Sequence, residues 1–254
     1  MTQSGAIWSG ATREWTIPLW PKWDKAALLK RRGEIGSQSF ARGFRQETLD
    51  DLSRTFPSVT RCAVDNLNPV EYMSRHWPVF TGVDLSSVTR PGNAIVSIAQ
   101  RPSDKKRLLV SVRAGDWTSP QLWRELEEED RRFRPVVFMV ENNAYQDALL
   151  EWGLELNATL PVQGFTTGKN KADPVMGLPG LEVEFENQGW MIPRPEHALD
   201  CECDWCRLWM ELTGHPIAES TDVVMALWFA REGARGAGRL LESGPVPWGE
   251  DYRG

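Results

Sequence analysis

The chain has 254 residues, enough for one large domain or two small ones with a substantial buried core. A hydrophobic content of 41% and a charged content of 25% are typical of a soluble globular protein and exclude a wholly disordered chain. The net charge of -6 gives no overall signal of nucleic-acid binding. No run approaches the roughly 20 apolar residues that cross a bilayer, and the N-terminus lacks a signal-peptide pattern. We therefore expect a cytoplasmic protein with no membrane partner.

The first 76 residues carry few strand signals. Apolar and charged residues alternate over Lys25–Gly33 as on an exposed helix, and Gln46–Phe56 predicts a second short helix with Thr48 as its cap. We expect residues 1–76 to form an N-terminal arm or linker, mostly helical or irregular, with little core of its own.

The pattern changes near residue 77, where short β-favouring runs begin. Three runs separated by turns predict an antiparallel meander, and helices then alternate with strands. The predicted elements are strands over 79–85, 94–99 and 107–112, a helix over 119–133, a strand over 135–140, a helix over 143–152, a strand over 160–165, and helices over 205–212 and 222–232. This order predicts an α/β fold over residues 77–232: a mixed β-sheet, with a three-strand antiparallel meander plus parallel strands, flanked by helices. Glycine and proline dominate residues 233–254, which we expect to be a flexible tail.

Three acidic residues lie at the ends of predicted elements. Asp84 lies at the end of the first predicted strand of the sheet. Glu141 directly follows the apolar strand predicted over 135–140, and Asp222 is the first residue of the final helix. A carboxylate beside a buried strand must be paired or bound to a cation, and oxygen ligands suit Mg²⁺ or Mn²⁺. Two such ions could activate water and stabilise the leaving oxygen of a phosphodiester. The alternative is that each acid is a helix cap or a solvated strand end.

The segments around these acids resemble the C-terminal nuclease domain of tailed-bacteriophage large terminases, which has an RNase H/RuvC-like fold. The similar segments are GVDLS at Asp84, VENNAYQ at Glu141, TDVVMALWFA at Asp222, the loop Phe165–Asp173 with Gly177 and the Trp190–Pro193 segment taken as a following helix, and the upstream stretches Trp23-Asp24 and Gly36–Phe44. The resemblance implies that Asp84, Glu141 and Asp222 bind two catalytic Mg²⁺ or Mn²⁺ ions. It also implies an endonuclease that cuts concatemeric viral double-stranded DNA during genome packaging, in the host cytoplasm.

Full-length large terminases also carry an ATPase, and its phosphate-binding loop is missing from this sequence. The nearest pattern, Gly164–Asn170, has its glycines one residue too close and Asn170 in place of the Ser or Thr that would hold Mg²⁺. We therefore expect either a piece of a longer protein or the product of a split gene. The expected partners are double-stranded DNA, a separate or missing ATPase motor, the small terminase subunit and the portal.

DNA binding by a chain of net charge -6 requires local basic groups, since each neutralised phosphate contributes at its own contact. Lys169 and Lys171, on a loop expected near the metals, are the best candidates, and Arg113 after the third strand is a weaker one. The alternative is that these are ordinary solvated side chains.

Three of the four cysteines crowd into one segment with a histidine. His197, Cys201, Cys203 and Cys206 offer four soft ligands at spacings that can build a tetrahedral zinc site, within a loop at 197–215. The remaining Cys62 stands alone, a distribution that favours a reducing compartment over a disulfide framework. The alternative to structural zinc is a set of reduced, partly buried thiols that lead into a helix.

Two other functions fit the same residues. A RuvC-like resolvase or transposase nuclease would share the fold and metals but prefer branched DNA. A non-catalytic adaptor stabilised by zinc would use the three acids only as caps.

Overall fold

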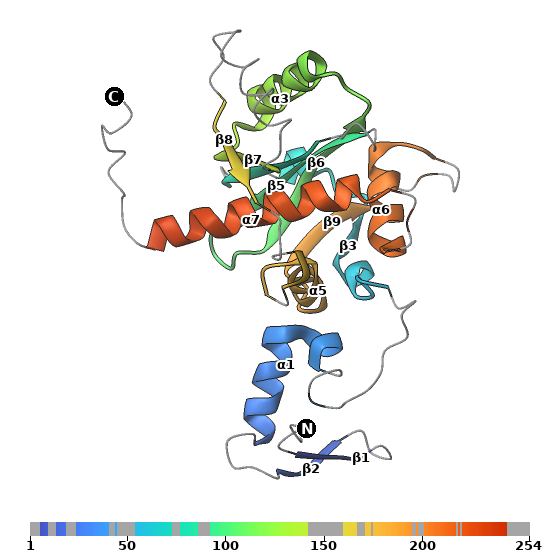
Figure 1. Cartoon of the computed structure of the whole chain (residues 1–254), viewed down its shortest axis with the longest axis vertical. Helices are drawn as coiled ribbons and strands as arrows, with labels where there is room; N and C mark the ends of the chain where they lie inside the picture. Colours follow the sequence, from blue (N-terminus) through green and yellow to red (C-terminus); the bar gives the residue numbers. More distant parts are fainter. Residues whose placement is uncertain are drawn as a thin grey trace.

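A seven-stranded mixed sheet forms the centre of the protein in the computed structural model (Figure 1). The structure describes residues 6–9, 14–18, 24–40, 44, 54–72, 77–85, 92–141, 160–166, 171–173, 175–194, 197, 201–216, 218 and 220–242. The strands of the central sheet are β3 (Ala63–Asp65), β4 (Val79–Asp84), β5 (Asn93–Gln100), β6 (Arg107–Gly115), β7 (Val137–Glu141), β8 (Val162–Phe165) and β9 (Trp190–Arg194). Their order across the sheet is β3-β9-β6-β5-β4-β7-β8.

The pairing of these strands confirms the predicted fold class. β4, β5 and β6 form an antiparallel meander, whereas β7 and β8 continue the sheet in parallel beyond β4. β9 and β3 add two parallel strands beyond β6. The central strands are almost entirely buried, as expected for a sheet that is covered on both faces.

Helices cover the two faces of the sheet. The helices of the described chain are α1 (Lys25–Phe40), α2 (Pro69–Tyr72), α3 (Ser119–Phe133), α5 (Leu178–Glu186), α6 (Asp204–Gly214) and α7 (Asp222–Glu242), with a 3-10 turn, η3, at Val59–Cys62. Figure 1 shows α7 crossing in front of the strands. The apolar side chains of α7 pack against one face of the sheet, on residues such as Val96 and Met139. Those of α3 pack against the opposite face, on residues such as Ile95 and Val140. None of the described helices combines the length and apolar character that a bilayer crossing demands.

The close contact between α7 and the sheet depends on Gly82 in β4. A Cβ atom there would lie 2.0 Å from the carbonyl oxygen of Ala226 and 2.3 Å from the backbone nitrogen of Ala230. Both atoms belong to the backbone of α7 and cannot turn aside. The missing side chain therefore lets the helix lie directly on β4.

The N-terminal arm is more structured than predicted. A hairpin of β1 (Ala6–Ser9) and β2 (Glu14–Pro18) precedes α1, and β3 from the same region joins the central sheet. The exposed helix predicted over Lys25–Gly33 is present within α1, which extends to Phe40. α1 packs on α5, where a Cβ on Gly36 would lie 2.7 Å from the side chain of Val183. The helix predicted over Gln46–Phe56 lies mostly outside the described residues, and residues 54–56 are not helical.

Three other elements differ from the sequence predictions. α5 and β9 were not predicted, and the residues taken as a helix near Trp190 form a buried strand. α7 continues to Glu242, ten residues into the predicted tail, because apolar positions such as Ala234 are still buried. The helix predicted over 143–152 lies outside the described residues.

The substitution Gly82→Ala should force α7 away from β4. We expect a loss of at least about 2 kcal/mol in the free energy of unfolding, because the new methyl group meets rigid backbone. Urea denaturation measures it. Gly236→Ala is the matched control, because Gly236 lies in α7 with no atom within 4 Å of an added Cβ. Alanine at this position should stabilise the protein by about 0.5–1 kcal/mol. Equal effects of the two substitutions would contradict the packing argument.

Candidate active site

Two of the three predicted acids lie side by side at the ends of adjacent parallel strands. β4 and β7 pair in register from Phe80 with Val137 to Val83 with Val140, so Asp84 and Glu141 are the next pair. Neighbouring strands are about 4.8 Å apart, which brings the two backbones within that range. Both residues are half-buried.

The alternation of side chains places both acids on the face that α7 covers. On β7, Met139 packs in the cluster around α7, whereas Val140 packs with α3. On β4, Gly82 touches α7 and Val83 packs with α3. Residues two apart share a face. Asp84 therefore lies on the side of Gly82, and Glu141 on the side of Met139.

The third acid, Asp222, begins α7 at the same end of the sheet. A Cβ on Gly92 would lie 2.8 Å from Oδ2 of Asp222, and Gly92 has a φ of 116° that disfavours other residues. Ala94, two residues later, pairs with Asp84 across β4 and β5. Gly92 directly precedes β5, so it lies near the end of the sheet at which Asp84 pairs with Ala94. The fold therefore brings the start of α7 to the strand ends that carry the other two acids.

Asp222 is 4% exposed and has a basic partner that the sequence did not reveal. Its Oδ2 accepts hydrogen bonds from Arg207 Nη2 at 3.3 Å and from Ser220 Oγ at 2.9 Å. A buried carboxylate requires such a partner. The only signal for Arg207 was its position on the predicted helix 205–212, and nothing in the sequence related that helix to Asp222.

The N-terminus of α7 is capped by another helix rather than by Asp222. Glu211 of α6 accepts hydrogen bonds through Oε2 from the backbone nitrogens of Val223 at 2.9 Å and Val224 at 3.1 Å. It also pairs with Arg207 at 3.2 Å. In this arrangement the first free amides of α7 are satisfied by Glu211, so Asp222 is not needed as a cap.

The donor set suits hard divalent cations. Two carboxylates in register on adjacent strands could supply oxygen ligands, and a third carboxylate, that of Asp222, lies at the same end of the sheet. Oxygen ligands of this kind hold Mg²⁺ or Mn²⁺. Arg207 forms an ion pair with one of the three acids, Asp222, at 3.3 Å.

The lysine-bearing loop follows β8, next to Glu141. Phe165 at the end of β8 pairs with Glu141, so the loop leaves the sheet beside the acids. Lys169 lies outside the described residues. Lys171 is exposed and lies near His215; burial lowers the pKa of that imidazole, and the charge of Lys171 lowers it further.

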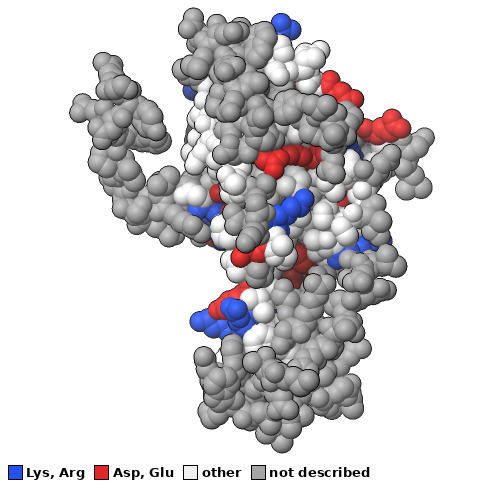
Figure 2. Space-filling model, in the orientation of Figure 1, with Lys and Arg blue, Asp and Glu red and all other residues white. Residues whose placement is uncertain are grey.

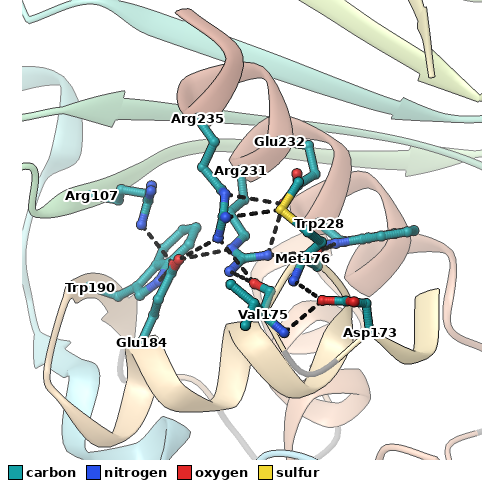
Figure 3. A network of polar contacts seen from close by, with 10 residues as sticks. All are labelled: Arg107, Asp173, Val175, Met176, Glu184, Trp190, Trp228, Arg231, Glu232 and Arg235. Carbon is teal, nitrogen blue, oxygen red and sulfur yellow. Dashed lines mark hydrogen bonds and ion pairs between the residues drawn. The ribbon is translucent and has the colours of Figure 1, made fainter. Parts of the chain in front are cut away.

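The far end of this loop is anchored to α7. Asp173 accepts hydrogen bonds from the backbone nitrogens of Val175 and Met176, which hold the pKa of its carboxyl below the usual value. The carbonyl oxygens of Val175 and Met176 accept bonds from Arg231 at 3.0 and 2.8 Å. Figure 3 shows the Arg231 guanidinium beside Val175 and Met176, with Asp173 on the other side of these two residues.

Arg231 is 1% exposed, and its charge is matched by acids (Figure 3). Its Nε donates to Glu184 Oε1 at 2.8 Å, while Arg107 and the Trp190 indole donate to Glu184 Oε2 at 2.6 and 2.9 Å. Glu232 also accepts from Arg231 at 2.8 Å. The network ties α5, β6 and β9 to α7 and fixes the segment at which the lysine-bearing loop ends.

The structure does not group Arg113 with the acids. This residue of β6 pairs with Ile95, which packs in the cluster around α3, and its guanidinium forms an ion pair with Glu125 of α3. Arg113 therefore lies on the face of the sheet opposite to α7.

The four predicted zinc ligands come together. His197 Nδ1 lies 3.3, 3.2 and 3.4 Å from the sulfur atoms of Cys201, Cys203 and Cys206, and the four ligand atoms lie within 4.8 Å of one another. Cys62 is buried elsewhere, in the core cluster around α7.

No family model matches the chain, and no curated protein matches it in sequence. Its structure is nevertheless similar to solved nuclease domains. The large terminase nuclease of the thermophilic phage G20c with bound magnesium gives a TM-score of 0.51 at 10% identity, over 72% of this chain and 98% of that one. The large terminase nuclease domain of phage P22 gives 0.51 at 12% identity, over 72% and 93%.

This chain has the fold of a large terminase nuclease domain. The predicted resemblance to the nuclease domain of large terminases is thereby confirmed at the level of fold. A third structure, the G20c nuclease with bound cobalt, gives a TM-score of 0.50 at 10% identity over 72% of this chain and 98% of that one.

Removal of the Arg207 charge should destabilise the protein, because the buried carboxylate of Asp222 is then left without a basic partner. We expect Arg207→Met to lower the free energy of unfolding by about 3 kcal/mol at neutral pH, because a buried carboxylate loses its partner. The double variant with Asp222→Asn should recover at least about 1 kcal/mol of that loss, since an amide needs no counter-charge. Urea denaturation of the four proteins in the cycle measures the coupling.

The matched control is Arg194→Met, which removes an arginine from an exposed pair with Asp65. Its effect should stay below about 1 kcal/mol. Additive effects of Arg207→Met and Asp222→Asn would show that the ion pair does not stabilise the buried carboxylate.

Proposed function

We propose that this protein is a metal-dependent DNA endonuclease of the large terminase type, which cuts concatemeric viral DNA during genome packaging. One observation carries the proposal: Asp84 and Glu141 lie in register on the face of the sheet that α7 covers, and α7 begins with Asp222. The similarity in fold to terminase nuclease domains solved with magnesium and cobalt supports it.

The proposed chemistry is hydrolysis of a phosphodiester with two divalent cations held by Asp84, Glu141 and Asp222. When bound, Mg²⁺ or Mn²⁺ would supply an activated water and stabilise the leaving oxygen. Asp84 and Glu141 provide ligands from adjacent strands, a rigid base that keeps their spacing constant. Asp222 would bind through Oδ1 while Arg207 and Ser220 hold Oδ2 and orient the carboxylate.

DNA would be held by local contacts rather than by overall charge. On the face shown in Figure 2, acidic and basic side chains of the described residues are interspersed rather than separated into patches of one sign. Lys171, and Lys169 close to it in sequence, would contact phosphates of the bound DNA. An ATPase motor, a small terminase subunit and a portal are the proposed partners that would hold and translocate the DNA.

Removal of a proposed metal ligand should abolish cleavage without unfolding the protein. We expect Asp84→Asn, Glu141→Gln and Asp222→Asn each to reduce Mn²⁺-dependent nicking of supercoiled plasmid by at least about 100-fold, because an amide binds a hard cation poorly. The matched control is Asp104→Asn, on the exposed turn between β5 and β6, where cleavage should persist. Full activity in Asp84→Asn, in protein free of contaminating nuclease, would overturn the proposal.

The lysine-bearing loop should set the salt dependence of DNA binding. In the Asp84→Asn background, replacement of Lys169 and Lys171 by alanine should weaken binding to duplex DNA and reduce the slope of log affinity against log salt by about 1 per lysine. Lys30→Ala, on the exposed surface of α1, is the control. Arg113→Ala should have a smaller effect than either loop lysine, because Arg113 is paired with Glu125 on the opposite face. Unchanged slopes in the lysine variants would exclude this loop as the phosphate contact.

A non-catalytic adaptor is the second candidate, and the ion pair between Arg207 and Asp222 favours it, because this pair neutralises one of the three acids. Calorimetric titration with Mn²⁺ separates the two functions. A nuclease should take up Mn²⁺ at the acids and lose that uptake in Asp84→Asn. An adaptor should show no uptake in either protein.

A further inference from the structure

We propose that His197, Cys201, Cys203 and Cys206 bind a structural zinc ion that fixes the start of α6, and through α6 the position of Asp222. The zinc site stands independently of the proposed nuclease, whereas its importance for cleavage rests on that function.

The four ligand atoms lie within 4.8 Å of one another, close enough to surround one zinc ion. Zinc binds sulfur at about 2.3 Å and imidazole nitrogen at about 2.0 Å, which separates N and S ligands by about 3.5 Å. The observed distances from His197 Nδ1 to the three sulfur atoms are 3.2–3.4 Å. The three cysteines are free thiols and lie partly exposed, within reach of an ion from solvent. Four protein ligands leave no open position, so the ion would be structural rather than catalytic.

The ligands span the short connection between β9 and α6. His197 follows β9, which ends at Arg194, whereas Cys203 is the N-cap residue of α6 and Cys206 lies in its first turn. The carbonyl oxygen of Cys203 accepts the first helical hydrogen bond of α6 from the backbone nitrogen of Arg207, at 2.9 Å. An ion held by all four would tie the end of β9 to the first turn of α6.

The helix anchored in this way carries the partners of α7. Arg207 directly follows the ligand Cys206 and binds Asp222, and Glu211, one turn later, accepts from the amides of Val223 and Val224. Loss of the ion would free the first turn of α6 and loosen both contacts. The zinc site would therefore act on the candidate active site through Arg207 and Glu211, without contact between the ion and the acids.

Metal analysis of the purified full chain tests the site. We expect one zinc per chain, and Co²⁺ in its place should give the intense absorption bands of tetrahedral thiolate coordination. Cys206→Ser and His197→Ala should lose the zinc, whereas Cys62→Ser, which alters the remote buried cysteine, should retain it. A zinc-free wild-type protein that also gives no cobalt spectrum, or variants that keep the full zinc content, would overturn the site.

A second measurement on the wild-type chain avoids variants that fail to fold. Removal of zinc with a chelator should make three thiols reactive while Cys62 stays protected, and added zinc should reverse the change. Hydrogen exchange at the amides of Val223 and Val224 should accelerate at least about 10-fold in the stripped protein. Loss of zinc with unchanged exchange at these amides would overturn the positioning role. Neither readout uses DNA cleavage, so failure of the nuclease proposal would leave both results interpretable.

Discussion

The parallel pairing of β4 with β7 is the constraint on which the rest of the candidate site depends. It sets Asp84 beside Glu141, because a register fixed by buried residues on both faces cannot slip without exposing them. The close approach of α7 at Gly82 then brings a third carboxylate to the same end of the sheet. Two backbone arrangements, a strand register and a helix-on-strand contact, thus place acids that are far apart in the chain.

Burial of Asp222 adds an electrostatic requirement to this geometry. A carboxylate with 4% exposure is stable only with a partner, and Arg207 provides one while also pairing with Glu211, which caps α7. The same helix, α6, begins at the cysteine cluster. A chain of contacts therefore runs from the four soft ligands through Arg207 and Glu211 to the acid, and separates the proposed structural metal from the proposed catalytic ones.

The sequence predicted what local patterns determine. Alternating and continuous apolar runs predicted the strands around Asp84 and Glu141, and the clustered spacing of His197 with three cysteines predicted their meeting. β9 and the length of α7 were missed, because proline at position 193 argues against a strand and glycines argue against a helix, and tertiary packing overrode both. Arg207 and Gly92 could not be related to Asp222, since only the fold brings these three segments together.

The central claim is that these acids hold a pair of divalent cations, and a crystal grown with Mn²⁺ tests it most directly. Anomalous diffraction should show two peaks about 3.5–4 Å apart, each bound by oxygens of Asp84, Glu141 or Asp222. A map without a peak between the ends of β4 and β7, with Arg207 as the only cation on Asp222, would contradict the account.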